Sequence, residues 1–136
     1  MAGKADYLEN LLLNCLFRGG GNVTALATTY VALFTTNPAD DGTGGTEVTG
    51  TGYARVAVTS SSGNWKDPST ATQGQISNTN KIVFPVANAP WGTITGFGVY
   101  DAPTSGNLLY WGTCSLTVNQ GDQPLFDISA LVISED

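Results

Sequence analysis

Histidine is absent from this sequence, and only two cysteines occur among its 136 residues. Histidine is the commonest general base and a frequent zinc ligand, so histidine-dependent triads and histidine-ligated zinc sites are excluded. A four-thiolate metal site is excluded as well, because Cys15 and Cys114 are the only thiols. We expect both to be buried and reduced, since free cysteine is among the most buried residue types. The sequence therefore predicts no enzyme and no cofactor.

Cations are also scarce. Five Lys and Arg stand against eleven Asp and Glu, which gives a formal net charge of −6, and charged residues make up only 12% of the chain. Proteins that bind a nucleic-acid backbone use clustered cations, so we expect no direct contact with nucleic acid. A surface poor in charge forms contacts mainly through neutral hydrogen bonds and apolar patches.

The sequence has no long hydrophobic run. The apolar stretch at residues 11–13 is far too short to span a bilayer, and no signal-peptide pattern precedes a cleavage site. We expect no membrane association, and a protein made and used without export. A length of 136 residues and a hydrophobic fraction of 41% fit one globular domain over residues 1–136.

One helix is predicted near the N-terminus, over residues 6–18. Its apolar residues follow helical spacing, and they are Leu8, Leu11, Leu12, Cys15 and Leu16. Asp6 is the expected N-cap, and the glycines after Arg18 end the helix. Leu13 and Phe17 lie off this stripe, so the helix carries more apolar surface than one contact face needs. It either covers the sheet or docks on a neighbour.

The remainder reads as short β-strands separated by turns, and no second stretch shows helical spacing. The predicted strands cover residues 29–35, 54–59, 81–85, 93–100, 108–113, 115–118, 125–128 and 131–134. This pattern predicts a mainly β fold: an antiparallel β-sandwich over residues 29–134, or a jelly-roll-like barrel, of about eight strands with one N-terminal amphipathic helix. Gly96 and Gly98 indicate a bulge or a close backbone approach, and residues 105–107 a hairpin turn.

Acidic residues raise two chemical possibilities. Asp40, Asp41 and Glu47 cluster in a glycine-rich stretch, and Asp122 precedes Asp127. The first possibility is a glycosidase, which uses a pair of carboxylates. The second is a calcium site built from oxygen ligands, but the spacing of a calcium-binding helix–loop–helix is absent. Acids in such a loop are more often solvated turn formers, so we predict no metal site.

The aromatic side chains suggest a possible carbohydrate-binding function, because sugars stack on exposed rings. Trp91 and Trp111 adjoin or end strands, so both are expected to pack between sheets. Trp65 lies within a polar loop over residues 60–74 and is the best candidate for an exposed contact residue. The alternative is that Trp65 plugs its own loop. Arg55 is isolated in a predicted strand, where it either pairs with an acid of another subunit or is simply exposed.

The order of segments resembles a family of small virion proteins of tailed bacteriophages, which are labelled tail-fibre or capsid-decoration proteins. The resemblance covers nearly the whole chain and rests on collinear strings that are individually ordinary. These strings are YLEN and LFRG in the helix, YVALFT, GTGGTEV, GYAR, VFPVA, WGTI, GVYDA and GNLLYWG.

The resemblance implies a virion subunit without catalytic activity, made in the host cytoplasm. We expect a capsid cement (decoration) protein on the outer capsid surface, which bridges major capsid protein subunits and copies of itself, as a homotrimer. A tail fibre, baseplate or tail adaptor component is the alternative, and a carbohydrate-binding module is a more remote one. The residues expected to bind partners are Leu8, Leu11, Leu12, Leu16, Arg55 and Trp65.

Overall fold

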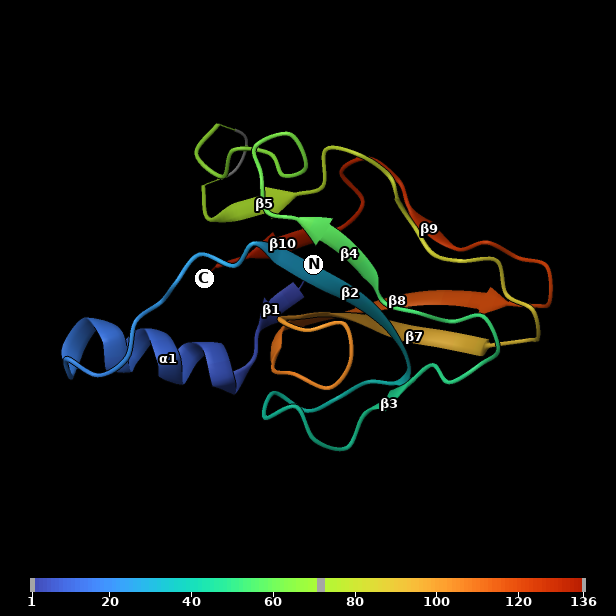
Figure 1. Ribbon diagram of the computed structural model, residues 1–136, viewed down its shortest axis with the longest axis horizontal. Helices are drawn as coiled ribbons and strands as arrows, with labels where there is room; N and C mark the ends of the chain where they lie inside the picture. The colour runs from blue at the N-terminus through green and yellow to red at the C-terminus, as the bar shows by residue number, and fades with distance from the viewer. Residues whose placement is uncertain (1, 71–72, 136) are drawn as a thin grey trace.

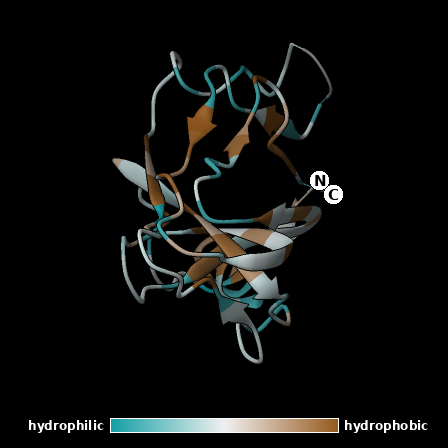
Figure 2. Cartoon of the chain, turned by 90° about the vertical axis from the view of Figure 1, so that its right-hand side faces the viewer, coloured by the Kyte–Doolittle hydropathy of each residue, from teal (hydrophilic) through white to brown (hydrophobic). Residues whose placement is uncertain are grey.

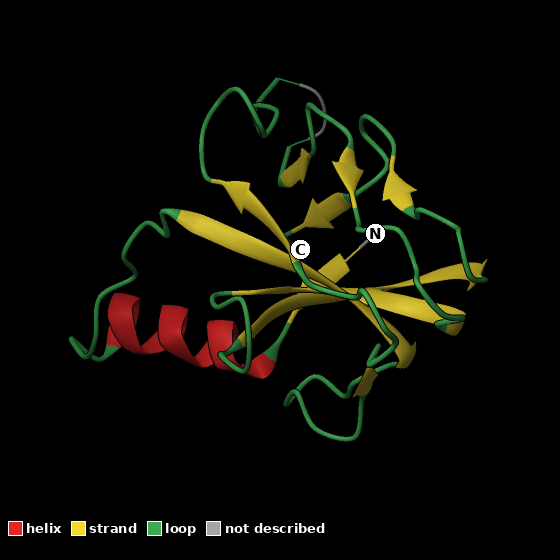
Figure 3. Ribbon diagram, turned by 45° about the vertical axis from the view of Figure 1, so that its right-hand side comes forward, coloured by secondary structure: helices red, strands yellow, loops and turns green. Residues whose placement is uncertain are grey.

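A computed structural model describes residues 2–70 and 73–135. The described chain contains one helix and ten strands (Figures 1 and 3). The elements are β1 (Ala2–Lys4), α1 (Asp6–Phe17), β2 (Thr28–Thr36), β3 (Thr46–Glu47), β4 (Val56–Thr59), β5 (Gln75–Ser77), β6 (Ile82–Val83), β7 (Gly92–Tyr100), β8 (Leu108–Val118), β9 (Leu125–Phe126) and β10 (Val132–Ser134).

The long strands form the centre of a large open sheet. Its order is β3-β2-β7-β8-β1-β10-β5, with β4 also paired to β2, and β6 and β9 form a separate two-stranded sheet. The two sheets enclose the core between them. A mainly β, sandwich-like fold with one N-terminal helix is therefore confirmed, whereas the barrel alternative is wrong because the large sheet does not close.

The two ends of the described chain meet in this sheet. β1 lies between β8 and β10, and Ala2 pairs with Gly112 on one side and with Ile133 on the other. The pairing with β10 is parallel, so the sheet is not purely antiparallel as predicted. β1, β3 and β5 were not predicted, because strands of two or three residues are too short to show alternation.

β8 is one strand rather than the two expected at residues 108–113 and 115–118. The register with β7 shifts between Ile94, which pairs with Leu116, and Gly96, which pairs with Thr113. This β-bulge absorbs the extra residue, so the strand continues through Cys114. The predicted irregularity near Gly96 is confirmed, and the 105–107 hairpin is confirmed by the pairing of Tyr100 with Leu108.

Two glycines of β7 are required by close packing. A Cβ at Gly96 would lie 2.2 Å from Asn37 Oδ1 and 2.8 Å from the Gly112 carbonyl oxygen. A Cβ at Gly98 would lie 2.7 Å from the ring of Phe34. A Cβ would collide at either position; the expected close backbone approach is found at Gly96, whereas side chains crowd Gly98.

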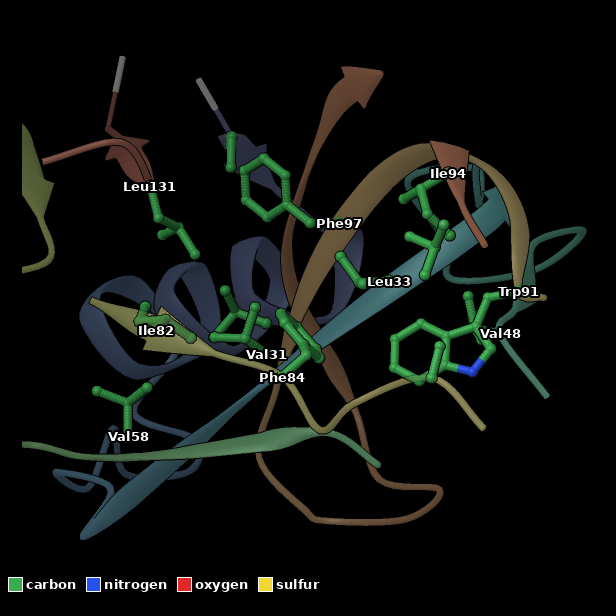
Figure 4. Close-up of a cluster of buried hydrophobic side chains, with 14 of the residues drawn as sticks. Val31, Leu33, Val48, Val58, Ile82, Phe84, Trp91, Ile94, Phe97 and Leu131 are labelled. Carbon is green, nitrogen blue, oxygen red and sulfur yellow. The ribbon is translucent and has the colours of Figure 1, made fainter. Parts of the chain in front are cut away.

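The core is aromatic and aliphatic, and its side chains converge between the two sheets (Figure 4). Phe97 contacts Phe126 edge-on with ring centroids 5.2 Å apart, and Tyr53 meets Trp91 in the same way at 5.4 Å. Phe84 is 1% exposed and stacks on Tyr53. Hydrophobic residues concentrate in the strands and polar residues in the loops (Figure 2). The burial of Trp91 between the sheets is confirmed.

Helix α1 begins differently from the prediction. Ala5 is the N-cap and no side chain caps the helix, so the prediction that Asp6 does so is wrong. Asp6 is already helical, and its backbone N–H donates to the Asp40 carbonyl at 2.9 Å. The 37–45 loop thus satisfies a donor that a capping side chain usually takes. The helix ends at Phe17 with Arg18 as the C-cap, followed by Gly19 at φ +63°.

The cysteines are unpaired and half-buried rather than buried. Burial raises the pKa of Cys114 on β8, which keeps that thiol protonated at neutral pH. Among the described residues, no helix is long and apolar enough to cross a membrane.

Candidate functional site

Helix α1 extends away from the sandwich as an arm (Figures 1 and 3). Its N-terminal end is anchored, because β1 is part of the sheet and the Ala5 N–H donates to the Leu109 carbonyl at 2.8 Å. None of its residues is buried. The alternative of a lid over the sandwich is therefore wrong, and docking on a neighbour stays a prediction.

The helix has two apolar faces. The predicted stripe is half-buried at Leu8, Leu11, Leu12 and Cys15, and Gly21 of the returning chain lies against Leu11. The other face contains Leu13, Leu16 and Phe17, which are 55%, 70% and 79% exposed, so Leu16 departs from the rest of the predicted stripe. Their spacing of three and four residues places these three side chains together. We call them the outer face of α1.

An exposed face of this kind is unusual for a soluble monomer. Scattered surface leucines are normal, but adjoining large apolar side chains on one helix face mark an interaction site. Val23 and Leu26, in the segment after the helix, are 46% and 39% exposed and add apolar surface to the same arm. The arm is therefore the first candidate for a docking surface.

Arg55 lies at the centre of a polar cluster inside the subunit. Its Nε and Nη2 atoms donate to the two carboxylate oxygens of Glu47, each at 2.8 Å, which forms a bidentate pair. Its Nη1 donates to the carbonyls of Ala102 and Ser105 at 2.9 and 2.8 Å. The guanidinium carbon lies 3.7 Å from the centre of the Tyr100 ring. The cluster ties β3 and the start of β4 to the β7–β8 hairpin.

The electrostatics of this cluster follow from burial. The Arg55 side chain is only 6% exposed. Burial opposes its charge, but the hydrogen bond and the charge of Glu47 outweigh that effect and raise the pKa of Arg55. Tyr53 donates to Glu47 Oε1 at 2.7 Å and accepts from the Leu33 N–H. Burial is the main cause of its raised pKa, and Glu47 adds to it.

These contacts change the interpretation of Arg55. It is neither exposed nor part of a strand, since β4 begins at Val56. Its acidic partner is Glu47 of the same chain, so we withdraw Arg55 from the residues expected to bind another subunit. No local pattern signalled this cluster, because the Ala102 and Ser105 carbonyls that complete it come from a hairpin distant in the chain.

Trp65 is half-buried and contacts the core, and it forms an isolated β-bridge with Asn78. It lies in the wall of a groove of about 800 Å³ under the 60–70 part of its loop. The floor of this groove is apolar, and the rest of its lining carries hydroxyl groups together with Lys66 and Asp67. The floor residues are Ile76, Val99, Leu109, Tyr110 and Ile133. Trp65 is therefore not the exposed residue that was predicted: it supports its own loop, as the alternative has it, and lines a recess, and its contact with a partner stays a prediction. Residues 71–72 of that loop lie outside the described residues.

A second recess of about 580 Å³ continues the first, because Pro68, Ile76, Tyr110 and Ile133 line both. Glu135, near the C-terminus, lines this second recess and accepts hydrogen bonds from Lys4 and Tyr110. We call the two together the Trp65 groove. Its polar rim includes Ser61, Ser62 and Thr70.

Each of the three acidic residues of the glycine-rich stretch is bonded to a different residue of the same chain. Asp40 accepts from the Trp111 indole at 2.8 Å, Asp41 accepts from Thr43, and Glu47 pairs with Arg55. The bond from Thr43 also lowers the pKa of Asp41. Trp111 is half-buried against the smaller cluster of Ala5, Phe34 and Leu108, rather than packed between the sheets. Asp40 and Asp41 lie in a turn, as predicted, whereas Glu47 lies in β3 and is not a turn former.

The resemblance in the sequence is supported by comparison with known families: this is a structural protein of a tailed-bacteriophage virion. The chain belongs to the family described as podophage GP4 fiber I protein gp80, whose model matches residues 3–134. No curated protein matches the chain.

Proposed function

We propose that the chain is a non-enzymatic subunit of the tail-fibre apparatus, which docks through α1 on a neighbouring subunit of the virion. The observation that carries this proposal is the outer face of α1, where Leu16 and Phe17 are more than two-thirds exposed on a helix without buried residues. An anchored arm of this kind is suited to helix-in-groove docking. The family name supports the location, because the podophage protein it describes is a fibre protein.

Capsid cement is the second candidate. It is favoured by the shape of the chain, since the described residues form one sandwich with an arm and no extended shaft. A cement protein on the outer capsid surface would bridge major capsid protein subunits, and its weak contacts would act by avidity over the lattice. Both candidates use the same docking arm.

Cryo-electron microscopy of purified particles tests the two locations. Density for the chain in a small number of copies around the tail is the result expected for a fibre subunit. Hundreds of copies over the shell would overturn the fibre proposal and establish the cement function. The same map identifies the protein that α1 contacts.

Particles assembled with an α1 variant test the docking role. We expect Leu16→Asp with Phe17→Asp to deplete the chain from particles, because two carboxylates cannot be buried at an apolar contact without a large desolvation cost. Ile128→Asp is the matched control, since Ile128 is 55% exposed but lies outside the arm. Incorporation of the α1 variant at the wild-type level would contradict this role for α1.

A further inference from the structure

We propose that the partner of the outer face of α1 is the Trp65 groove of a second copy of this chain. The proposal deepens the proposed function, because it names what the arm binds. It rests on two features of the single subunit: three adjoining exposed apolar side chains on a helix, and a recess lined by the half-buried side chains of Trp65, Ile76 and Tyr110. A patch that fits a recess elsewhere on the same molecule produces contacts between copies.

The two surfaces match in character. The helix offers leucine and phenylalanine, and the groove offers the partly exposed apolar side chains of Trp65, Ile76 and Tyr110. A twelve-residue helix is about 18 Å long, and its C-terminal half places the outer face within about two turns. The hydroxyl rim allows the remaining helix surface, such as Asn10 and Asn14, to stay hydrated.

The helix of the same subunit does not fill this groove. Its N-terminal end is fixed by the bonds from Ala5 to Leu109 and from Asp6 to Asp40. From that point α1 extends to one side of the sandwich and lies apart from β5 and from the 60–70 loop in both ribbon views (Figures 1 and 3). Closing the arm onto its own groove would break these anchors, whereas a second copy can supply the helix without any change.

Buried area decides between a one-way and a reciprocal contact. The outer face offers roughly 350 Å², counting about 100 Å² for each leucine and about 150 Å² for the phenylalanine. With the groove side included, one contact buries about 700 Å², which is within the range of weak lattice contacts. Two contacts bury about 1,400 Å², which is the size of a specific interface. A closed dimer, in which each copy gives one helix to the other and receives one, is therefore the stable form.

Solution mass tests the proposal on the purified full-length chain. We expect a closed dimer by light scattering, and a monomer for the double variant Leu16→Asp with Phe17→Asp. Ser62→Trp should also dissociate the assembly, because it fills the groove from its exposed rim. The matched controls Ile128→Asp and Ser115→Trp, at exposed positions outside both surfaces, should leave the mass unchanged. A wild-type monomer at all concentrations would overturn the proposal.

Crosslinking between two different chains tests the contact itself. Both chains carry Cys15→Ser and Cys114→Ser; one adds Asn10→Cys on the arm, and the other adds Ser62→Cys on the groove rim. A short bis-maleimide should join a mixture of the two into a species of twice the chain mass, since each chain has only one thiol. Moving the second thiol to Ser115 should abolish the product. Equal crosslinking at Ser62 and Ser115 would show that the groove is not the binding site.

The outcomes distinguish this inference from the proposed function. A chain that is monomeric in solution but present around the tail would end the inference and leave the fibre function standing. A chain that exchanges helices in solution but covers the capsid shell would support the inference and overturn the fibre function.

Discussion

The sandwich and the α1 arm differ in what holds them in place. In the sandwich, residues such as Phe84 and Ile94 are almost completely buried, and the aromatic rings contact one another. The arm has no buried residue, and its longest apolar side chain, Phe17, is 79% exposed. The same residue types therefore stabilise the fold in one region and are available to a partner in the other. The amount of burial, rather than residue type, separates structure from assembly here.

The largest expected difference is between two phenylalanines. Phe84→Ala should lower the free energy of unfolding by about 3–5 kcal/mol, because it leaves a cavity among Tyr53 and Phe126. Phe17→Ala should change it by no more than about 0.5 kcal/mol, since the ring is exposed. Urea denaturation of dilute protein measures both. A similar loss in the two variants would contradict the contrast between the regions.

The Arg55 cluster gives the next largest effect. Arg55→Gln should cost about 2–4 kcal/mol, because it removes the bidentate pair and leaves Glu47 partly buried without its counter-ion. Lys81→Gln changes an exposed cation and should cost no more than about 0.5 kcal/mol.

A double-mutant cycle sharpens this result. Arg55→Gln combined with Glu47→Gln should cost less than the two single variants together, because the second change removes the uncompensated charge left by the first. Strict additivity, measured by denaturation, would show that the two residues stabilise the fold independently.

Substitution of one glycine in the sandwich and one after the helix compares how tightly the backbone is packed in the two regions. Gly96→Ala should destabilise by about 1–3 kcal/mol, because its Cβ would collide with Asn37 and the Gly112 carbonyl. Gly20→Ala, with no atom within 4 Å of the added Cβ, should be neutral or stabilise by up to about 1 kcal/mol. Thermal unfolding followed by circular dichroism distinguishes the two, and a destabilising Gly20→Ala would show that the arm is packed more tightly than the structure indicates.

Alkaline pH should weaken the sandwich gradually. The pKa of Tyr53 and the pKa of Tyr110 are both raised, mainly by burial, so the folded chain keeps protons that the unfolded chain releases above about pH 10. The contribution of these tyrosines to the free energy of unfolding is therefore fully present below that pH. It falls above that pH by up to about 1.4 kcal/mol per pH unit for each tyrosine. Tyr53→Phe should flatten the decline in urea midpoints between pH 9 and 11.5. An unchanged slope would mean that Tyr53 is not responsible.

Much of the fold follows from local sequence. The strands β2 and β7, the 105–107 turn and the need for glycine at residues 96 and 98 were all predicted, because alternation and turn chemistry act over a few residues. The continuity of β8 and the short strands β1, β3 and β5 were not predicted. Their pairing depends on neighbours distant in the chain, such as β10 for β1.

The candidate site was predicted only in part. The sequence showed that the helix carries apolar residues on more than one face, and Leu13 and Phe17 proved to be exposed. Trp65 was found because an aromatic residue in a polar loop is visible in the sequence. The groove beside Trp65 was not predicted, since the residues of its floor come from β5, β7, β8 and β10.

The sequence by itself determined the class of fold, the single helix and the absence of histidine chemistry, because composition and short-range periodicity carry that information. Only the tertiary structure decided what each apolar or charged side chain contacts. Arg55 looked isolated in the sequence, yet folding brings Glu47, Tyr100 and two hairpin carbonyls to it. Leu16 and Phe17 look like core residues, yet the arm leaves them in solvent. Burial and pairing depend on where distant segments meet, which no local pattern specifies.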